Sequence, residues 1–194
     1  MPPSGSDDES FGQLDPLALG LAAGTAETAE FWIMHDIQLF GVLEVRTRGI
    51  RLSGEDFGGA RPRHLLALLA LRGEWSLVEL ADTLGVSATT LNDDLGILRD
   101  RLEPGVGHRD SVITSHQGRV GLARERVHID TVTFDQLVAM AAERPPARAA
   151  RPLAAAAFLA SRPLLEDEDA VWAAEARAEY RAKLITASEP QPIG

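Results

Sequence analysis

Polar side chains that can hydrogen-bond to nucleic-acid bases are concentrated in one short stretch of the sequence, at Thr89, Thr90, Asn92 and Asp93. Groups that could contact phosphates stand before and after this stretch, at Arg63, Arg99, Arg109, His116 and Arg119. An α-helix fits the major groove of B-DNA, where Thr and Asn side chains can reach base edges. The planar guanidinium group matches the geometry of phosphate. These residue types and their order therefore predict a double-stranded DNA partner.

The sequence shows no pattern typical of a metal site, a nucleotide-binding site or an enzyme active site. The sequence has no cysteine, and its five histidines show no metal-ligand spacing such as H-x-x-x-H. It contains neither a glycine-rich phosphate-binding motif nor the G-x-S-x-G nucleophile elbow of hydrolases. The four consecutive acids at 166–169 precede an expected helix, where the helix dipole favours negative charge. We therefore expect no catalytic residues, no metal site and no cofactor.

A helix-turn-helix pattern would position the stretch that begins at Thr89. Ser76 and Glu79 form a capping box at the start of a first helix, which ends at Gly85. Ser87 caps a second helix, whose apolar residues recur at helical spacing, at Leu91, Leu95, Leu98 and Leu102. Because this leucine stripe must be buried, we expect the opposite side of the helix to be exposed and able to lie along a duplex.

β-Hairpins are expected on both sides of this pattern. Residues 37–52 alternate between apolar and polar side chains around a Thr-Arg-Gly turn, with Ile50 and Leu52 on the return strand. A leucine-rich helix should then stop at Gly73. Residues 112–122 predict a second hairpin, and a hairpin directly after a helix-turn-helix makes a winged helix. Further on, we expect a helix around Thr131, a linker at 143–152, and helices at 153–160 and 171–184.

Charge and composition narrow the class of protein. The 194 residues hold 19 Lys and Arg against 29 Asp and Glu, and a net charge of −10 counts against non-specific coating of nucleic acid. Residues 1–35 contain six acids and no Lys or Arg, which indicates a disordered acidic tail. No apolar run is long enough to span a membrane, and the start lacks the pattern of a signal peptide. We therefore expect a cytoplasmic protein without a membrane partner.

Residues 36–140 resemble the winged-helix DNA-binding domain of OmpR-type response regulators, in the version found in the Streptomyces antibiotic regulatory proteins. The matching segments are IQLFGVLEVR, RPRHLLALLALRG, TTLNDDLGILRDRL and SVITSHQGRVGL. HIDTVTFDQLV and RPLLEDEDAVWAAEARAEYRAKL are similar to the start of the family's bacterial transcriptional activation domain, which is built from helical repeats.

The resemblance implies an α+β fold: a winged helix-turn-helix with an amino-terminal β-hairpin or sheet, followed by a short all-α, helical-repeat-like piece. We expect a disordered acidic tail at 1–35, a winged-helix domain at 36–130, a helical segment at 131–186 and a disordered tail at 187–194. The function implied is that of a sequence-specific transcription regulator, classed with activators, that binds direct repeats. Its carboxyl-terminal helices would contact RNA polymerase, another protein or a second protomer of a homodimer on DNA.

Two features leave alternatives open. The expected recognition helix carries Asn92, Asp93 and Asp94 where the family usually has basic or amide groups, and phosphate repels carboxylates, although Asp can accept from cytosine N4. A degenerate winged helix that docks a protein and does not bind DNA is therefore the alternative function, with Arg99 and Arg101 paired to neighbouring acids. The helical piece has room for about one and a half helix pairs, fewer than a repeat array needs. Either the chain is part of something longer, or this piece packs on the winged helix.

Overall fold

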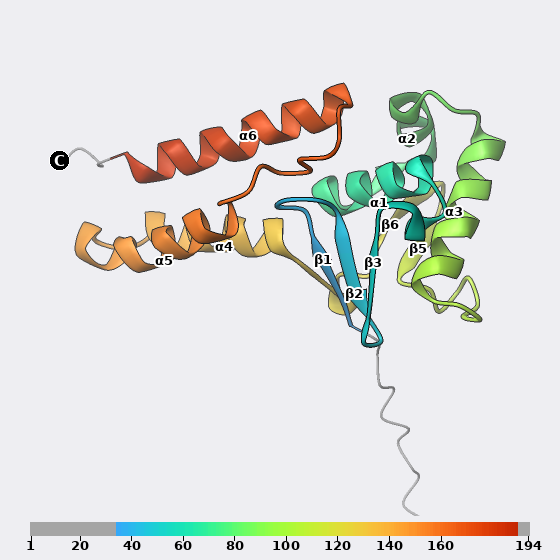
Figure 1. The fold of residues 1–194 in the computed structure, drawn as a ribbon, viewed down its shortest axis with the longest axis horizontal. Helices are drawn as coiled ribbons and strands as arrows, with labels where there is room; N and C mark the ends of the chain where they lie inside the picture. Colours follow the sequence, from blue (N-terminus) through green and yellow to red (C-terminus); the bar gives the residue numbers. More distant parts are fainter. Residues whose placement is uncertain (1–33, 190–194) are drawn as a thin grey trace, which may run out of the picture. The chain divides into compact units, whose positions relative to one another are not determined.

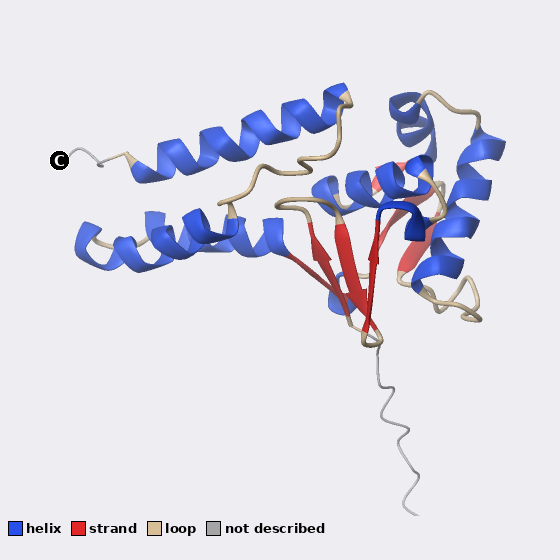
Figure 2. Cartoon of the chain, viewed as in Figure 1, coloured by secondary structure: helices blue, strands red, loops and turns tan. Residues whose placement is uncertain are grey.

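The computed structural model describes residues 34–189, in which two β-sheets and six α-helices occur (Figure 1, Figure 2). The acidic tail expected at 1–35 lies outside the described residues except for its last two positions, and there β1 already begins at His35. The tail expected at 187–194 is wrong at its first two positions, because α6 continues to Ser188.

The amino-terminal sheet has the strand order β3-β2-β1-β7. The strands β1 (His35–Gln38), β2 (Glu44–Thr47) and β3 (Ile50–Ser53) form an antiparallel meander, and β7 (Val127–Ile129) pairs parallel to β1. The turn between β2 and β3 lies where it was predicted, and Arg48 and Gly49 both have positive φ, at 51° and 74°, as tight hairpin turns require.

The prediction of one hairpin over 37–52 is wrong in its first half, because the chain leaves the strand at Leu39. The backbone N–H groups of Leu39 and Phe40 donate to the Asp130 carboxylate, at 2.9 Å each, and not to a neighbouring strand. Gly41 then turns the chain with φ 98°. A side chain 91 residues away from Leu39 therefore ends β1.

The two helices predicted before and after Gly85 have the predicted boundaries. After η1 (Gly54–Phe57), α1 (Ala60–Arg72) ends at Gly73, and the short strand β4 (Trp75–Ser76) leads into α2 (Leu77–Leu84) and α3 (Ala88–Leu102). The capping box is present, since the Ser76 hydroxyl accepts from the Glu79 backbone N–H at 3.1 Å and the Glu79 carboxylate reaches back to Ser76. Gly85 takes the left-handed conformation, with φ 66°.

The second predicted hairpin is formed by β5 (Ile113–His116) and β6 (Arg119–Leu122), with Gln117 and Gly118 in the turn at φ 49° and 75°. The short strand β4 pairs with β6, which gives the order β4-β6-β5. Because β4 directly precedes α2, this pairing fixes the hairpin to the start of the helix-turn-helix elements. The short helix η2 (Arg124–Arg126) follows.

The carboxyl-terminal segment consists of α4 (Asp130–Ala142), α5 (Pro146–Leu159) and α6 (Val171–Ser188). The linker expected at 143–152 is wrong, because α5 begins at Pro146. Proline fits the first position of a helix, where its missing N–H is not needed, and the alanines that follow favour a helix. In Figure 1 these three helices lie together on one side of the amino-terminal sheet.

One hydrophobic core joins the helical segment to the rest of the described chain. The Phe40 ring lies after β1, with its centroid 5.4 Å from that of Phe134 on α4 and 5.8 Å from that of Tyr180 on α6. The Leu39 and Phe40 amides also bind Asp130 at the start of α4. The structure therefore shows that the helical piece packs on the amino-terminal sheet.

A buried group of charged side chains lies beneath the loop after α3. Glu103 is 2% exposed and forms an ion pair with Arg126, and His35 Nε2 lies 3.4 Å from the Glu103 carboxylate. The carboxylate also accepts from the backbone N–H of Val112 at 2.6 Å, and Arg126 donates to the Asp110 carbonyl at 2.6 Å. Both ends of the loop between α3 and β5 are thereby held.

Replacing His35 by glutamine should make the stability of the protein less dependent on pH. Burial lowers the pKa of His35 from its ordinary value of 6.5, although the Glu103 carboxylate opposes this shift. As the pH falls below 6.5, the unfolded chain therefore binds a proton that the folded chain does not bind, and the free energy of unfolding decreases.

Urea unfolding at about pH 7.5 and about pH 5.5, on either side of the ordinary histidine pKa, measures this effect. The wild-type protein should lose more stability on acidification than His35→Gln does. His116→Gln, which changes an exposed histidine, is the control and should behave like wild type. Equal losses in all three proteins would contradict the prediction.

Candidate nucleic-acid interface

The two sides of α3 differ as the leucine stripe predicts. Its four leucines, at 91, 95, 98 and 102, are at most 2% exposed and belong to the core. On the other side, Thr89, Asn92 and Asp93 are exposed and Thr90 is half-buried. We call this side of α3, with residues 89, 90, 92, 93, 96 and 100, the outer face. Among residues 34–189, no element covers it.

Arg99 lies at the edge of the outer face that borders the hairpin. Its guanidinium donates to the Ile113 carbonyl at 3.3 Å and to the Ser115 hydroxyl at 2.6 Å, and it lies 3.2 Å from His108 Nδ1. All three of its nitrogens therefore have partners, and partial burial lowers its pKa. We interpret Arg99 as the residue that holds β5 against α3, in place of the phosphate contact expected from the sequence.

Arg61 and Arg101 lie at the opposite edge. Arg61, on α1, binds the Asp94 carboxylate through Nε at 2.9 Å and Nη2 at 3.3 Å. Asp94 is 1% exposed, whereas the Arg61 side chain is 58% exposed, so the buried carboxylate holds an arginine at the surface. This hydrogen-bonded pair raises the pKa of Arg61. The alternative that Arg99 and Arg101 pair with the neighbouring acids Asp94, Asp100 or Glu103 is wrong for residues 34–189, where neither arginine forms an ion pair and Arg61 from another helix binds Asp94.

Arg63 is not brought to this face. It binds Asp167 at 2.8 Å and Glu168 at 3.1 Å, in the segment before α6, and its side chain is 20% exposed. The neighbouring His64 also lies 2.6 Å from Glu168. Part of the acidic run at 166–169 therefore attaches α1 to the segment before α6, and we omit Arg63 from the interface.

The remaining predicted residues lie along the hairpin and the loop before it. His116 and Arg119 face each other across the tip of the hairpin and are both exposed. Arg119 binds Glu74 at 2.9 Å. Arg109 is exposed in the loop between α3 and β5, and it forms no ion pair with a described residue. The structure thus brings α3, this loop and the hairpin tip into one region.

Comparison with known proteins gives a likeness in fold. No family model and no curated protein matches the chain. The structure is similar to that of Mycobacterium tuberculosis EmbR in complex with a low affinity phosphopeptide, with a TM-score of 0.62 and 19% sequence identity. The match covers 80% of this chain and 43% of the EmbR chain, so it spans less than half of that protein. At this identity the likeness concerns the fold alone.

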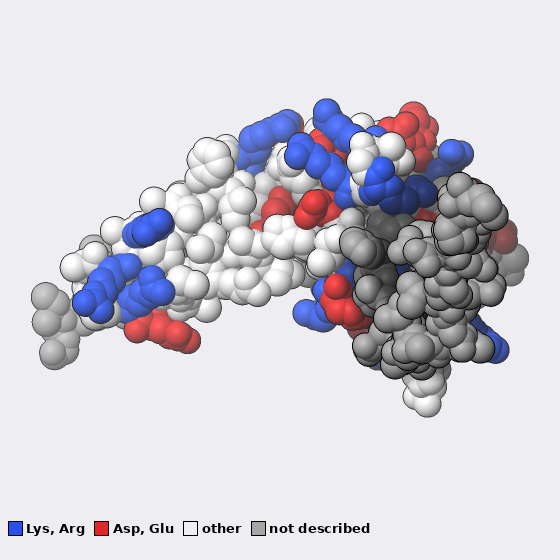
Figure 3. Space-filling view, turned by 90° about the horizontal axis from the view of Figure 1, so that it is seen from below, with Lys and Arg blue, Asp and Glu red and all other residues white. Residues whose placement is uncertain are grey.

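Charges of both signs occur across the candidate interface. Residues 77–122, which include α2, α3 and the hairpin, hold four arginines and seven acids. Asp93 and Asp100 are exposed on the outer face and form no ion pair within residues 34–189. On the part of the surface that Figure 3 shows, Lys and Arg are likewise interspersed with Asp and Glu. A contact with DNA here must depend on the position of each charge and not on the net charge.

Sequence reasoning missed the link between Arg61 and Asp94. A clue was present, because Asp94 lies three residues after Leu91 and four before Leu98, on the flank of the buried leucine stripe. A carboxylate at such a position needs a cation, but the sequence did not indicate which arginine supplies it. Within residues 34–189, no cluster of metal-ligating side chains occurs and no helix is long and apolar enough to cross a membrane.

Proposed function

We propose that this protein is a transcription regulator that binds double-stranded DNA through a winged helix-turn-helix. In this proposal α3 lies in the major groove, and the hairpin of β5 and β6 is the wing. The observation that carries it is the exposed outer face of α3, with its leucines buried behind it and a strand pair fixed beside it by Arg99. The fold likeness to EmbR supports the fold that this proposal requires.

The order of charges across α3 also supports this proposal. Successive residues of an α-helix are 100° apart, so Arg99 and Arg101 project to opposite edges, with Asp100 midway between them. In a major groove the edges of a helix face the phosphates and its middle faces the bases. Arg101 would then meet phosphate, while Asp93 could accept a hydrogen bond from cytosine N4. Thr89, Thr90 and Asn92 would contribute to base selection.

Selection of bound sequences from a random DNA pool, followed by binding at several salt concentrations, tests the proposal. The logarithm of the affinity should fall linearly with that of salt, by about 0.9 per phosphate contact. Arg101→Ala should weaken all sequences equally and reduce this slope by about one. Asn92→Ala should relax the preference at one base pair, at a cost of about 1–3 kcal/mol.

Arg151→Ala, on the exposed surface of α5, is the matched control and should leave affinity and salt slope unchanged. If no sequence is enriched and binding does not depend on salt, the DNA proposal fails.

That result would favour a second function, a protein-docking module. The specific observation in its favour is the pair of carboxylates, Asp93 and Asp100, on the outer face beside the 39% exposed Ile97. The contact of α4–α6 with RNA polymerase and the homodimer on DNA remain predictions from the family resemblance. The cytoplasmic location remains a prediction from the sequence pattern.

A further inference from the structure

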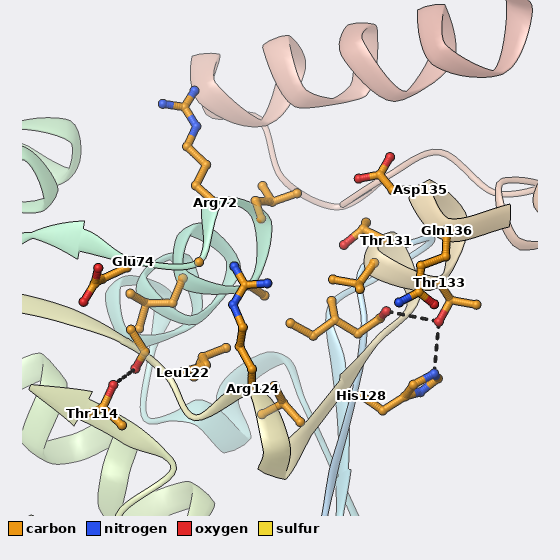
Figure 4. Close-up of a pocket in the computed structure, with 18 of the residues that line it drawn as sticks. Arg72, Glu74, Thr114, Leu122, Arg124, His128, Thr131, Thr133, Asp135 and Gln136 are labelled. Atoms are coloured by element: carbon orange, nitrogen blue, oxygen red, sulfur yellow. Dashed lines mark hydrogen bonds between the residues drawn. The ribbon is translucent and has the colours of Figure 1, made fainter. Parts of the chain in front are cut away.

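A cavity of about 810 Å³ lies between the carboxyl-terminal end of α1, the hairpin and the start of α4. Its walls come from both halves of the described chain. Residues 69–74, 121, 122 and 124 lie on one side, and residues 131–133, 135 and 136 on the other (Figure 4). Cavities of about 300–1,000 Å³ with a few placed polar groups are typical binding sites for small molecules. None of the residues assigned to the DNA interface lines this cavity.

Two arginines in the cavity wall have no carboxylate partner among residues 34–189. These are Arg72 at the end of α1 and Arg124 after β6. Two acids also line the cavity, but Glu74 is bound by Arg119 at 2.9 Å and Asp135 by Lys183 at 3.0 Å. Lys183 also pairs with Glu179 at 3.1 Å. When these partners are counted with the lining residues, four cations stand against three carboxylates, so the cavity carries a small excess of positive charge.

The Arg124 guanidinium lies against the end of α1. A Cβ atom built at Gly73 would lie 2.8 Å from Arg124 Nη2. Arg72 makes a cation–π contact with Trp75, with 5.2 Å between the guanidinium carbon and the ring centroid. Figure 4 shows the Arg72 guanidinium pointing away from Arg124, so Arg124 is the cation placed between the end of α1 and α4.

The opposite wall provides neutral polar groups and apolar surface. Figure 4 shows Thr131, Thr133 and Gln136 on α4 facing the end of α1 across the cavity. The Thr133 hydroxyl lies 3.0 Å from His128 Nε2. Apolar side chains complete the lining, at Leu69, Leu122, Val127 and Val132. A guanidinium, neutral polar groups and apolar walls fit a molecule with one anionic group on an apolar body.

We propose that this cavity binds a small organic anion, with Arg124 holding its carboxylate or phosphate group. The apolar body of the ligand lies against Leu122, Val127 and Val132. This proposal does not depend on DNA binding, and the test contains no DNA, so the two can fail separately.

The test is a titration of the full ¹⁵N-labelled chain, followed by NMR, with three probes of similar size. Benzoate and phenyl phosphate carry the two anionic groups, and benzamide has the same ring without charge. Both anions, or one of them, should shift the amide signals of Gly73, Thr133 and Gln136, with a dissociation constant of about 1 mM or lower. A response to benzoate alone or to phenyl phosphate alone identifies which anionic group the site prefers.

Arg124→Gln should weaken anion binding at least about tenfold, because a hydrogen bond to a charged group is lost. Arg151→Gln removes the same charge on α5, away from the cavity, and should bind the anions like wild type. The proposal is overturned if neither anion shifts these signals, if benzamide binds equally well, or if Arg151→Gln weakens binding as much as Arg124→Gln.

Discussion

Gly96→Trp should abolish DNA binding and leave the protein folded. No atom outside its own helix lies within 4 Å of a Cβ built at Gly96, so the fold has room for a large side chain. Glycine inside a helix also costs about 1 kcal/mol relative to alanine, so most replacements favour the helix. An indole in the middle of the outer face would keep α3 out of the groove. We expect the affinity to fall at least about 100-fold, or about 2.8 kcal/mol.

Two further variants separate the effect on binding from an effect on folding. Gly96→Ala should raise the free energy of unfolding by about 1 kcal/mol, measured in urea, and retain DNA binding. Ala155→Trp places the same indole on the exposed surface of α5 and should bind DNA like wild type. Binding by Gly96→Trp at wild-type affinity would show that this side of α3 does not enter the groove.

Glu103→Gln should have the largest effect on stability. The substitution keeps the shape of the side chain but removes the negative charge that pairs with Arg126, which is 6% exposed, and faces the buried His35. Breaking a buried ion pair from one side costs about 3–5 kcal/mol, because the other charge stays buried without compensation. This is a large part of the about 5–15 kcal/mol that stabilises a typical domain.

Urea unfolding measures this loss, with Glu143→Gln at the exposed carboxyl-terminal end of α4 as the control. The control should stay within about 0.5 kcal/mol of wild type. A similarly small change for Glu103→Gln would mean that the buried charges contribute no net stability. The variant should also loosen the loop between α3 and β5, because the amide of Val112 loses a charged acceptor.

Features governed by neighbours in the sequence could be predicted. The capping box of Ser76 and Glu79, the left-handed Gly85 and the leucine stripe of α3 each depend on residues a few positions apart, and the structure confirms them. The prediction of a linker at 143–152 is wrong, although the residues that decide it are also close together in the sequence. The prolines and arginines of this segment are typical of a linker, but Pro146 stands at the first position of α5, where proline is favourable.

Features governed by distant residues could not be predicted. Arg61 and Asp94 are 33 positions apart, and Arg63 and Asp167 are 104 positions apart. Either arginine could have been assigned to phosphate from the sequence, because both are cations near the start of a helix. Only the packing of α1 against α3 and against the segment before α6 decides that Arg61 stays near the outer face and Arg63 does not.

The Asp130 carboxylate, which accepts the amides of Leu39 and Phe40, has a consequence for how this chain could be divided. Strand β7 ends at Ile129 and α4 starts at the next residue, so no hinge separates the sheet from the helices. A break at this joint would deprive both amides of their acceptor and uncover the Phe134 and Tyr180 rings. We therefore expect neither half to be transferable as an independent module, whether by laboratory truncation or by recombination between genes.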